Sequence, residues 1–146
     1  MKVKIKKHHN DAIIPEYKTK GASGFDLHAV EDVLFFVNDT KLVSTGLSFQ
    51  VPEGYELQVR PRSGMSLKTP MRVSNSPGTI DSDFSGIVCV IMTHIPCGQG
   101  TISYSIKKGD RIAQGVILPI IKAEFEEVDE LDKTERGACG FGSTGK

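Results

Sequence analysis

The sequence predicts an all-β fold, a single-domain sandwich or barrel. Apolar and polar residues alternate with a period of two along most of the chain, as in strands that bury one face. Turn-forming residues interrupt this alternation about every 8–12 residues, a spacing typical of antiparallel sandwiches and barrels and not of alternating βαβ units. The 146 residues suit one domain, which can bury roughly two-thirds of the surface that its unfolded chain exposes.

Each predicted strand is a short alternating segment. The strands are residues 3–5, 34–37, 41–50, 55–60, 71–74, 87–93, 101–106, 111–120 and 123–128. Glycine, proline, asparagine and aspartate mark the turns between them, as at residues 52–54, 76–78 and 108–110. Residues 64–68 are predicted to form one short helical turn. We expect a core of residues 1–128, followed by an arm of residues 129–146.

The end of the chain, residues 136–145, is the most informative segment. It contains four glycines, one arginine, one aromatic ring and two hydroxyls, without hydrophobic periodicity. Glycines let backbone amides approach a ligand closely, and a guanidinium binds phosphate oxygens in a bidentate manner. The composition favours a flexible flap that closes over a nucleotide, and the alternative is a frayed chain end.

The charge balance argues against nucleic acid as a partner. Lysine and arginine total 18, as do aspartate and glutamate, so the net charge is zero. A duplex-binding domain normally carries a basic excess or stripe. The one dense basic run, residues 2–7, alternates with Val3 and Ile5 and is interpreted as an exposed edge strand.

The cysteines and histidines do not indicate a protein-ligated transition metal. Cys89, Cys97 and Cys139 form no Cys-x-x-Cys pair, and the four histidines lack zinc-ligand spacing. An odd number of thiols favours a reducing compartment, and no apolar run approaches the ~18 residues of a membrane span. We therefore expect a soluble, cytoplasmic protein without a membrane partner.

The hairpin around residue 81 offers a candidate base. Asp81 and Asp83 follow a short apolar stretch and precede Phe84. A carboxylate at a strand end can take a proton from water. The same residues are also ordinary turn formers.

Three further segments combine polar groups with glycine. Arg62, Ser63 and Gly64 open the helical turn, where free N–H groups and a guanidinium suit phosphate. Gln114, in residues 109–114, has an amide that could reach a ligand, and Asp26, in residues 22–27, could pair with an arginine such as Arg62. Taken singly, each segment is equally compatible with a surface turn.

Taken in order, these segments resemble the five motifs of the trimeric deoxyuridine triphosphatases (dUTPases). The matching residues are 22–29, 61–64, 78–86, 109–114 and 136–145, which extend over almost the whole chain. The last, Arg-Gly-x-x-Gly-Phe-Gly-Ser-Thr-Gly, is the best single match. The resemblance implies a jelly-roll-like distorted barrel whose C-terminal flap closes over the active site of a neighbouring subunit in a homotrimer.

The resemblance also implies the reaction. The family hydrolyses dUTP to dUMP and pyrophosphate, which lowers dUTP and supplies dUMP for dTTP synthesis. Asp81 corresponds to the carboxylate that activates the water attacking the α-phosphate. Mg²⁺ is implied as the cofactor, held by the three phosphates and water without direct protein ligands.

Roles for other residues follow from the same resemblance. Gln114 and Arg136 join Asp81 as catalytic residues, and Asp26 and Asp83 support them. Substrate-binding roles are implied for Arg62, Ser63, Gly64, Asn75, Thr79, Ile80, Asp81, Phe84, Cys89, Gln114, Arg136, Phe141, Gly142, Ser143 and Thr144.

The chain departs from the family at several positions. Phe84 replaces the usual tyrosine that packs on deoxyribose, and we expect its ring to keep the sugar selectivity. Ser85, Ile87 and the pair Thr93-His94 also differ from the usual residues. A related deaminase would need a glutamate where residues 90–92 are apolar. A non-catalytic or moonlighting nucleotide sensor on the same scaffold remains the alternative.

Overall fold

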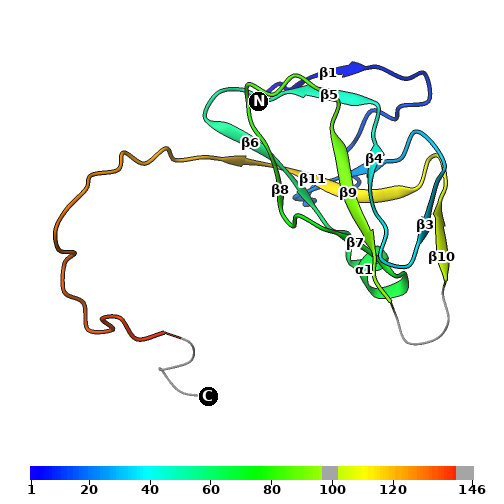
Figure 1. Ribbon diagram of the computed structural model, residues 1–146. Coiled ribbons are helices and arrows are strands. Elements are labelled where there is room, and N and C mark those ends of the chain that lie inside the picture. The colour runs from blue at the N-terminus through cyan, green and yellow to red at the C-terminus, as the bar shows by residue number, and fades with distance from the viewer. Residues whose placement is uncertain (97–101, 141–146) are drawn as a thin grey trace.

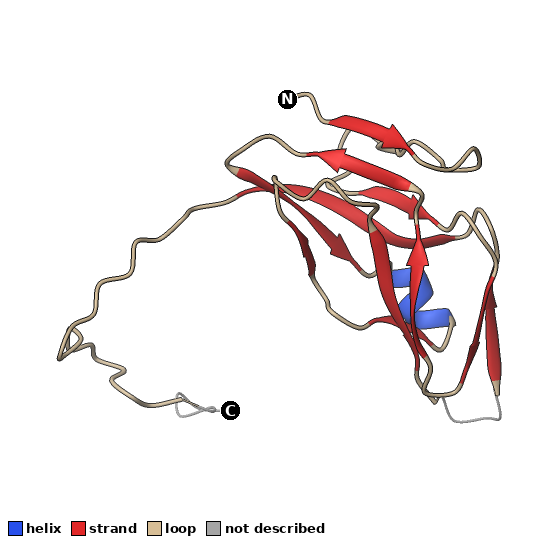
Figure 2. Ribbon diagram, turned by 45° about the horizontal axis from the view of Figure 1, so that its top comes forward, coloured by secondary structure: helices blue, strands red, loops and turns tan. Residues whose placement is uncertain are grey.

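The structure consists almost entirely of short strands. The computed structural model describes residues 1–96 and 102–140 (Figures 1 and 2). The elements are β1 (Lys4–Lys7), β2 (Phe25–His28), β3 (Val33–Phe36), β4 (Thr40–Ser44), β5 (Leu47–Gln50), β6 (Tyr55–Arg60), α1 (Ser63–Lys68), β7 (Met71–Val73), β8 (Gly78–Ile80), β9 (Cys89–His94), β10 (Ser103–Ile106) and β11 (Arg111–Pro119). The predicted all-β fold with one short helical turn is confirmed. Within the described ranges no helix is long and apolar enough to cross a membrane.

The strands form antiparallel sheets that bring distant parts of the sequence together. Their orders are β2-β11-β6-β8, β4-β9-β7, β1-β5 and β10-β3. In the largest sheet, β2 near the N-terminus pairs with β11 near the C-terminus, as Phe25 with Gly115. Residues ninety positions apart in the sequence therefore lie side by side.

One apolar core fills the space between the sheets. Alternate residues of β9 and β6 are buried, as period-two strands with one solvent-facing side require. The largest fully buried side chains include Phe35, Leu27, Leu47, Leu57, Met71, Met92, Ile106 and Ile112. This core fixes the register of the strands that carry the candidate site.

Some predicted boundaries were wrong for local reasons. The segment 41–50 is two strands, β4 and β5, because the chain bends at Gly46, where φ is 65° and a Cβ would lie 2.8 Å from Val30 Cγ1. The short strands β2 and β8 were not assigned from the sequence. They contain four and three residues and lie within the segments 22–29 and 78–86, whose glycine and polar residues are equally compatible with turns.

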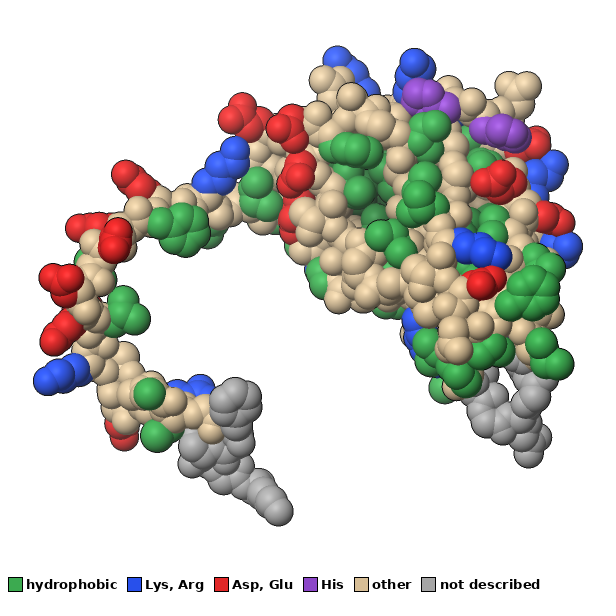
Figure 3. Space-filling view, in the orientation of Figure 1, with side chains coloured by type: hydrophobic (Ala, Val, Ile, Leu, Met, Phe, Trp, Pro, Cys, Tyr) green, Lys and Arg blue, Asp and Glu red, His purple; other side chains and the backbone are tan. Residues whose placement is uncertain are grey.

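The segment 123–128 is not a strand, contrary to the prediction. After β11 ends at Pro119, residues 121–139 are exposed and leave the body as an extended arm (Figure 1). Phe125 is 94% exposed, although it belongs to the alternation that predicted this strand, and Ile121, just before the predicted strand, is 98% exposed. Acidic side chains follow the arm outward from the body (Figure 3).

A methyl group at Gly115 is expected to destabilise the fold. A Cβ there would lie 2.4 Å from Phe25 Cε2 and 3.0 Å from Leu57 Cδ1. The Phe25 ring is held by Tyr17 (5.6 Å between centroids) and by Phe49 (6.1 Å), so it has little freedom to retreat. Gly115→Ala should therefore cost about 1–3 kcal/mol, a fall of roughly 2–10 °C in the thermal midpoint measured by circular dichroism. Gly21→Ala, with no heavy atom within 4 Å, is the matched control and should leave the midpoint unchanged.

Candidate active site

Most of the polar segments singled out in the sequence meet on the sheet β2-β11-β6-β8. Gln114 pairs with Asp26 of β2 on one side and with Arg60 of β6 on the other. Gln58, two residues before Arg60, pairs with Thr79 of β8. Directly paired residues share a face, and so do residues two apart on one strand. These side chains therefore form one polar face.

The Asp26 carboxylate holds two arginines at the edge of this face. Arg62 Nε donates to Asp26 Oδ1 at 2.8 Å, and Arg111 Nη1 donates to Asp26 Oδ2 at 3.3 Å. Arg62 Nη1 also donates to the Arg111 carbonyl oxygen at 3.3 Å. The expected ion pair of Asp26 with Arg62 is thus present. With the Asp26 side chain only 14% exposed, the contact orients the guanidinium.

Gln114 holds the chain just before Arg62. Its Nε2 donates to the Pro61 carbonyl oxygen at 2.8 Å. On its other side, a Cβ on Gly24 would lie 2.7 Å from Gln114 Oε1 and 3.2 Å from the Gly115 carbonyl oxygen, so a larger residue there would displace the Gln114 side chain. The side-chain amide that the sequence offered to a ligand is thus engaged with the protein. In this conformation Gln114 positions the Arg62 segment.

The first turn of α1 presents backbone donors beside Arg62. Ser66 N is the first amide to bond within the helix, to the Arg62 carbonyl oxygen at 3.0 Å. The N–H groups of Ser63 and Gly64 precede it, and both residues are exposed. Arg62 is the N-cap residue, without a side-chain cap bond. A guanidinium and two free amides therefore lie together.

The loop between β7 and β8, together with β8, carries the residues implied in base recognition; the two strands belong to different sheets and do not form the expected hairpin with each other. β8 pairs with β6 through Ile80 to Leu57 and Gly78 to Val59. A Cβ on Gly78 would lie 3.1 Å from Asn75 Nδ2, so the Asn75 side chain lies directly against the Gly78 backbone. Asn75 and Thr79 are exposed and Ile80 is half-buried.

Asp81 immediately follows β8 and faces solvent. Its backbone carbonyl accepts the Phe84 N–H at 3.2 Å, which closes a turn. Among the described residues, no hydrogen bond or ion pair engages the Asp81 carboxylate. The group is therefore available to a water molecule or a substrate.

Phe84, Cys89 and Asp83 take different positions around this turn. The Phe84 ring lies over Gly86, where a Cβ would be 2.6 Å from Phe84 Cζ. Cys89 begins β9, pairs with Ser44 and is half-buried. Asp83 is exposed and lines two hollows beside β1.

The structure does not bring the arm to this site. Arg136 Nε donates to the Cys139 carbonyl oxygen of its own turn at 3.0 Å. The arm carries this turn away from the body (Figure 1). The remaining flap residues, Phe141, Gly142, Ser143 and Thr144, lie outside the described residues.

Sequence reasoning missed two residues beside Asp26. Arg111 belongs to the same segment as Gln114, and a cation at the start of that strand was its only signal. His28, two residues after Asp26, pairs with Arg111 in the sheet register. Burial lowers the pKa of His28, and Asp26 partly opposes this shift. A neutral imidazole there leaves the arginines as the local cations.

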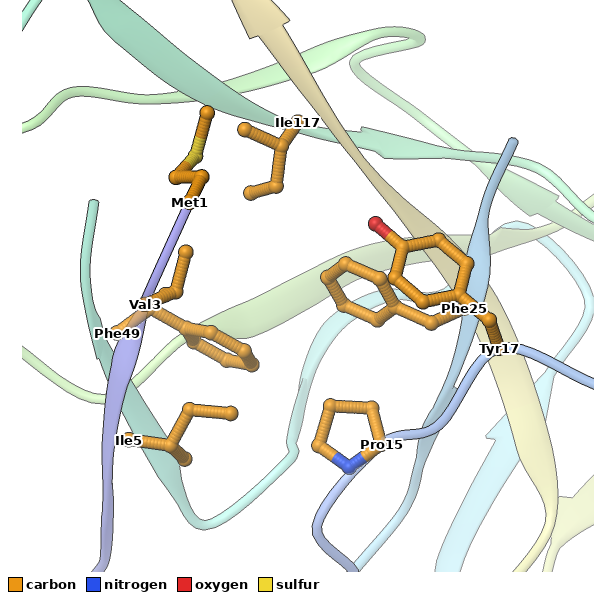
Figure 4. Close-up of a pocket in the computed structure, with 8 residues that line it drawn as sticks. All are labelled: Met1, Val3, Ile5, Pro15, Tyr17, Phe25, Phe49 and Ile117. Carbon is orange, nitrogen blue, oxygen red and sulfur yellow. The ribbon is translucent and has the colours of Figure 1, made fainter. Parts of the chain in front are cut away.

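An apolar hollow of the surface lies elsewhere. It measures about 400 Å³ between β1, β5 and the start of β2, and its lining is shown in Figure 4: Met1, Val3, Ile5, Pro15, Tyr17, Phe25, Phe49 and Ile117. It contains none of the candidate residues. In the described part of the chain, no three His, Cys, Asp or Glu side chains gather closely enough to hold a metal ion.

Known proteins share both the sequence and the fold. The family model described as dUTPase matches residues 10–145. Deoxyuridine 5'-triphosphate nucleotidohydrolase of Nautilia profundicola is 52% identical over 146 residues, covering 100% of both chains. The protein of the same name from Helicobacter pylori strain 26695 is 49% identical, covering 99% of this chain and 97% of its own.

A solved structure agrees with these relatives. The Staphylococcus bacteriophage 80alpha dUTPase with dUPNHPP superposes with a TM-score of 0.90, at 29% identity and 99% coverage of each chain. Three findings agree on the family of this chain. The relatives are about half identical over the full length, the family model covers residues 10–145, and the solved structure shares the fold. The chain belongs to the dUTPase family.

Proposed function

We propose that the protein hydrolyses dUTP to dUMP and pyrophosphate with Asp81 as the general base. The observation that supports this most directly is the Asp81 carboxylate. It is exposed and has no partner among the described residues, at the end of a strand whose sheet also carries the Asp26–Arg62 pair. Curated relatives about half identical to this chain carry the name deoxyuridine 5'-triphosphate nucleotidohydrolase.

The proposed mechanism is in-line attack of water on the α-phosphate. Asp81 accepts the proton of the water as its oxygen bonds to phosphorus and pyrophosphate leaves. Arg62, with Ser63 and Gly64, binds the oxygens that gain negative charge. Arg62 Nη2 has no partner within the described chain, so it is free for phosphate. Fixed donors of this kind need no reorganisation during the reaction.

Mg²⁺ is the proposed cofactor, and the side chains suit a phosphate-held ion. Magnesium retains water ligands and commonly binds through substrate phosphates together with few carboxylates. Asp81 is the acidic residue that directly follows β8, and Asp83 lies two residues further along the chain. When bound, the ion would neutralise the phosphate oxygens and favour departure of pyrophosphate.

Uracil would be recognised by the β7–β8 loop and by β8 itself. Asn75 and the backbone of Thr79 and Ile80 would pair with its polar edge. Cytosine presents a donor where uracil presents an acceptor, which would leave buried polar groups unpaired. Cys89 would contribute a backbone contact, and Phe84 would pack on deoxyribose where a 2′-hydroxyl otherwise fits.

The arm would complete the site in a homotrimer. Arg136 would bind the γ-phosphate, Phe141 would stack on uracil, and Ser143 and Thr144 would donate to phosphate oxygens. Ile121 and Phe125 are exposed, and docking of the arm on another chain would remove their apolar surface from water, which supports this arrangement. We propose the cytoplasm as the location, in keeping with the free thiols of Cys89 and Cys139.

A nucleotide panel tests the substrate. Pyrophosphate release should be followed with dUTP, dTTP, dCTP and UTP, each with Mg²⁺ and with excess chelator. We expect kcat/KM for dUTP to exceed that for dCTP by about 10⁴-fold, since dCTP leaves hydrogen-bonding groups unpaired. Chelator should abolish most of the activity. Tight dUTP binding without pyrophosphate release would instead support a nucleotide sensor.

A further inference from the structure

The loop that carries Phe84 depends on few contacts. Residues 81–88 contain no strand, and the Phe84 ring lies so close to Gly86 that a Cβ there would be 2.6 Å from Phe84 Cζ. Phenylalanine has no hydroxyl with which to anchor its ring. A shift of Gly86 would therefore move the surface on which the ring lies.

Gly86 is held by a buried hydroxyl on β5. Ser48 Oγ donates to the Gly86 carbonyl oxygen at 2.8 Å, and Ser48 is only 7% exposed. Because this bond uses the single hydroxyl hydrogen, Ser48 Oγ must accept at its second contact, 2.8 Å from His8 Nε2. His8 Nε2 is then the donor. His8 is itself fixed by its backbone N–H, which donates to the Gly46 carbonyl oxygen at 2.8 Å.

Space is available for the ring if this support is lost. A groove of about 450 Å³ separates the loop from β1 and β5, and Phe84 and Ser48 both line it. A ring freed from its seat on Gly86 could turn into this groove. The hydrogen bonds from His8 to Ser48 and from Ser48 to Gly86 oppose that movement.

We propose that Ser48, oriented by His8, is a positioning residue for sugar selectivity. By fixing the Gly86 carbonyl it holds the Phe84 ring where a ribose 2′-hydroxyl would lie. The proposal rests on the proposed function, in which Phe84 packs on the deoxyribose of dUTP. Neither Ser48 nor His8 touches the reacting atoms, so dUTP turnover depends on them only weakly.

The first test is Ser48→Ala, assayed for pyrophosphate release from dUTP and from UTP. The Gly86 carbonyl loses its donor, and the ratio of kcat/KM for UTP to that for dUTP should rise about tenfold, the size expected for one lost buried hydrogen bond. The kcat for dUTP should change by less than about threefold, since the general base is intact. Ser48→Thr keeps the hydroxyl and should restore the wild-type ratio.

Thr45→Val is the matched control. Thr45 is also buried, at 1% exposure, and its Oγ1 donates to the Val88 carbonyl oxygen of the same loop at 2.7 Å. Val88 lies further from Phe84 along the loop than Gly86 does. This variant should lower the thermal midpoint about as much as Ser48→Ala does, without changing the selectivity ratio. A similar loss of selectivity in Thr45→Val would indicate general loosening of the loop and would overturn the proposal.

His8→Ala provides a second test if Ser48→Ala does not fold. His8 is exposed, so its replacement perturbs the core little. The His8→Ala variant should also raise the ratio of kcat/KM for UTP to that for dUTP. Unchanged ratios in the variants that fold would overturn the proposal while leaving dUTP hydrolysis intact. A wild-type protein without dUTP hydrolysis would contradict the proposed function itself.

Discussion

Asp81→Asn is expected to lower kcat for dUTP by roughly 10²–10⁴-fold, the usual contribution of a general base. Asparagine has the same shape but a far weaker affinity for a proton, so the attacking water loses its acceptor. Because Asp81 is exposed and makes no described side-chain contact, the fold should tolerate the change. Pyrophosphate release under single-turnover conditions would measure the chemical step directly.

The KM for dUTP should change little in this variant. The groups proposed to bind phosphate, led by Arg62, are untouched, and loss of a carboxylate reduces repulsion of a polyanion. Glu31→Gln removes one exposed negative charge away from the β7–β8 loop and serves as the control for net charge. If Asp81→Asn retains more than about a tenth of the wild-type kcat, another group must be the base.

The sequence was sufficient for the longer strands, which alternate over at least six residues. β6 was predicted at its observed bounds, and β11 to within one residue. The break at Gly46 depends on a contact with Val30, which no local pattern reveals. Residues 123–128 alternate as a strand does, yet alternation does not tell which surface, if any, supplies the pairing partner.

The candidate site was predictable in its chemistry and less so in its geometry. The Asp26–Arg62 ion pair follows from two opposite charges in motifs that had to meet. The contact of Arg111 with Asp26 depends on a register shift between Arg111 and Ala113, which appears only when the strands pair. The bond from Gln114 to the Pro61 carbonyl oxygen depends on the same pairing. The sequence therefore predicts which residue types form the site, whereas their hydrogen-bond partners depend on how the strands pair in the sheet.

Deleting residues 136–146 should lower kcat/KM for dUTP by at least about 10²-fold. The deletion removes the proposed γ-phosphate contact of Arg136 and the flap that excludes water, and a lost contact to charge costs about that factor or more. The body should keep its thermal midpoint, because the described part of this segment makes contacts only within the arm. A deletion variant with wild-type kcat/KM would contradict any catalytic part for the flap.

Co-expression of the Asp81→Asn variant with the arm-deleted variant tests which chain supplies the flap of each active site. An Asp81→Asn chain keeps its arm, and an arm-deleted chain keeps Asp81. If one subunit's arm closes over another's site, some sites in a mixed trimer combine an intact Asp81 with an intact arm, and activity returns. If each arm closes over its own site, no such site can form, and the mixture stays as inactive as its parents. Mass measurement of the assembly must accompany the assay, because only mixed oligomers answer the question. The extended arm, with Ile121 and Phe125 in solvent, favours restored activity.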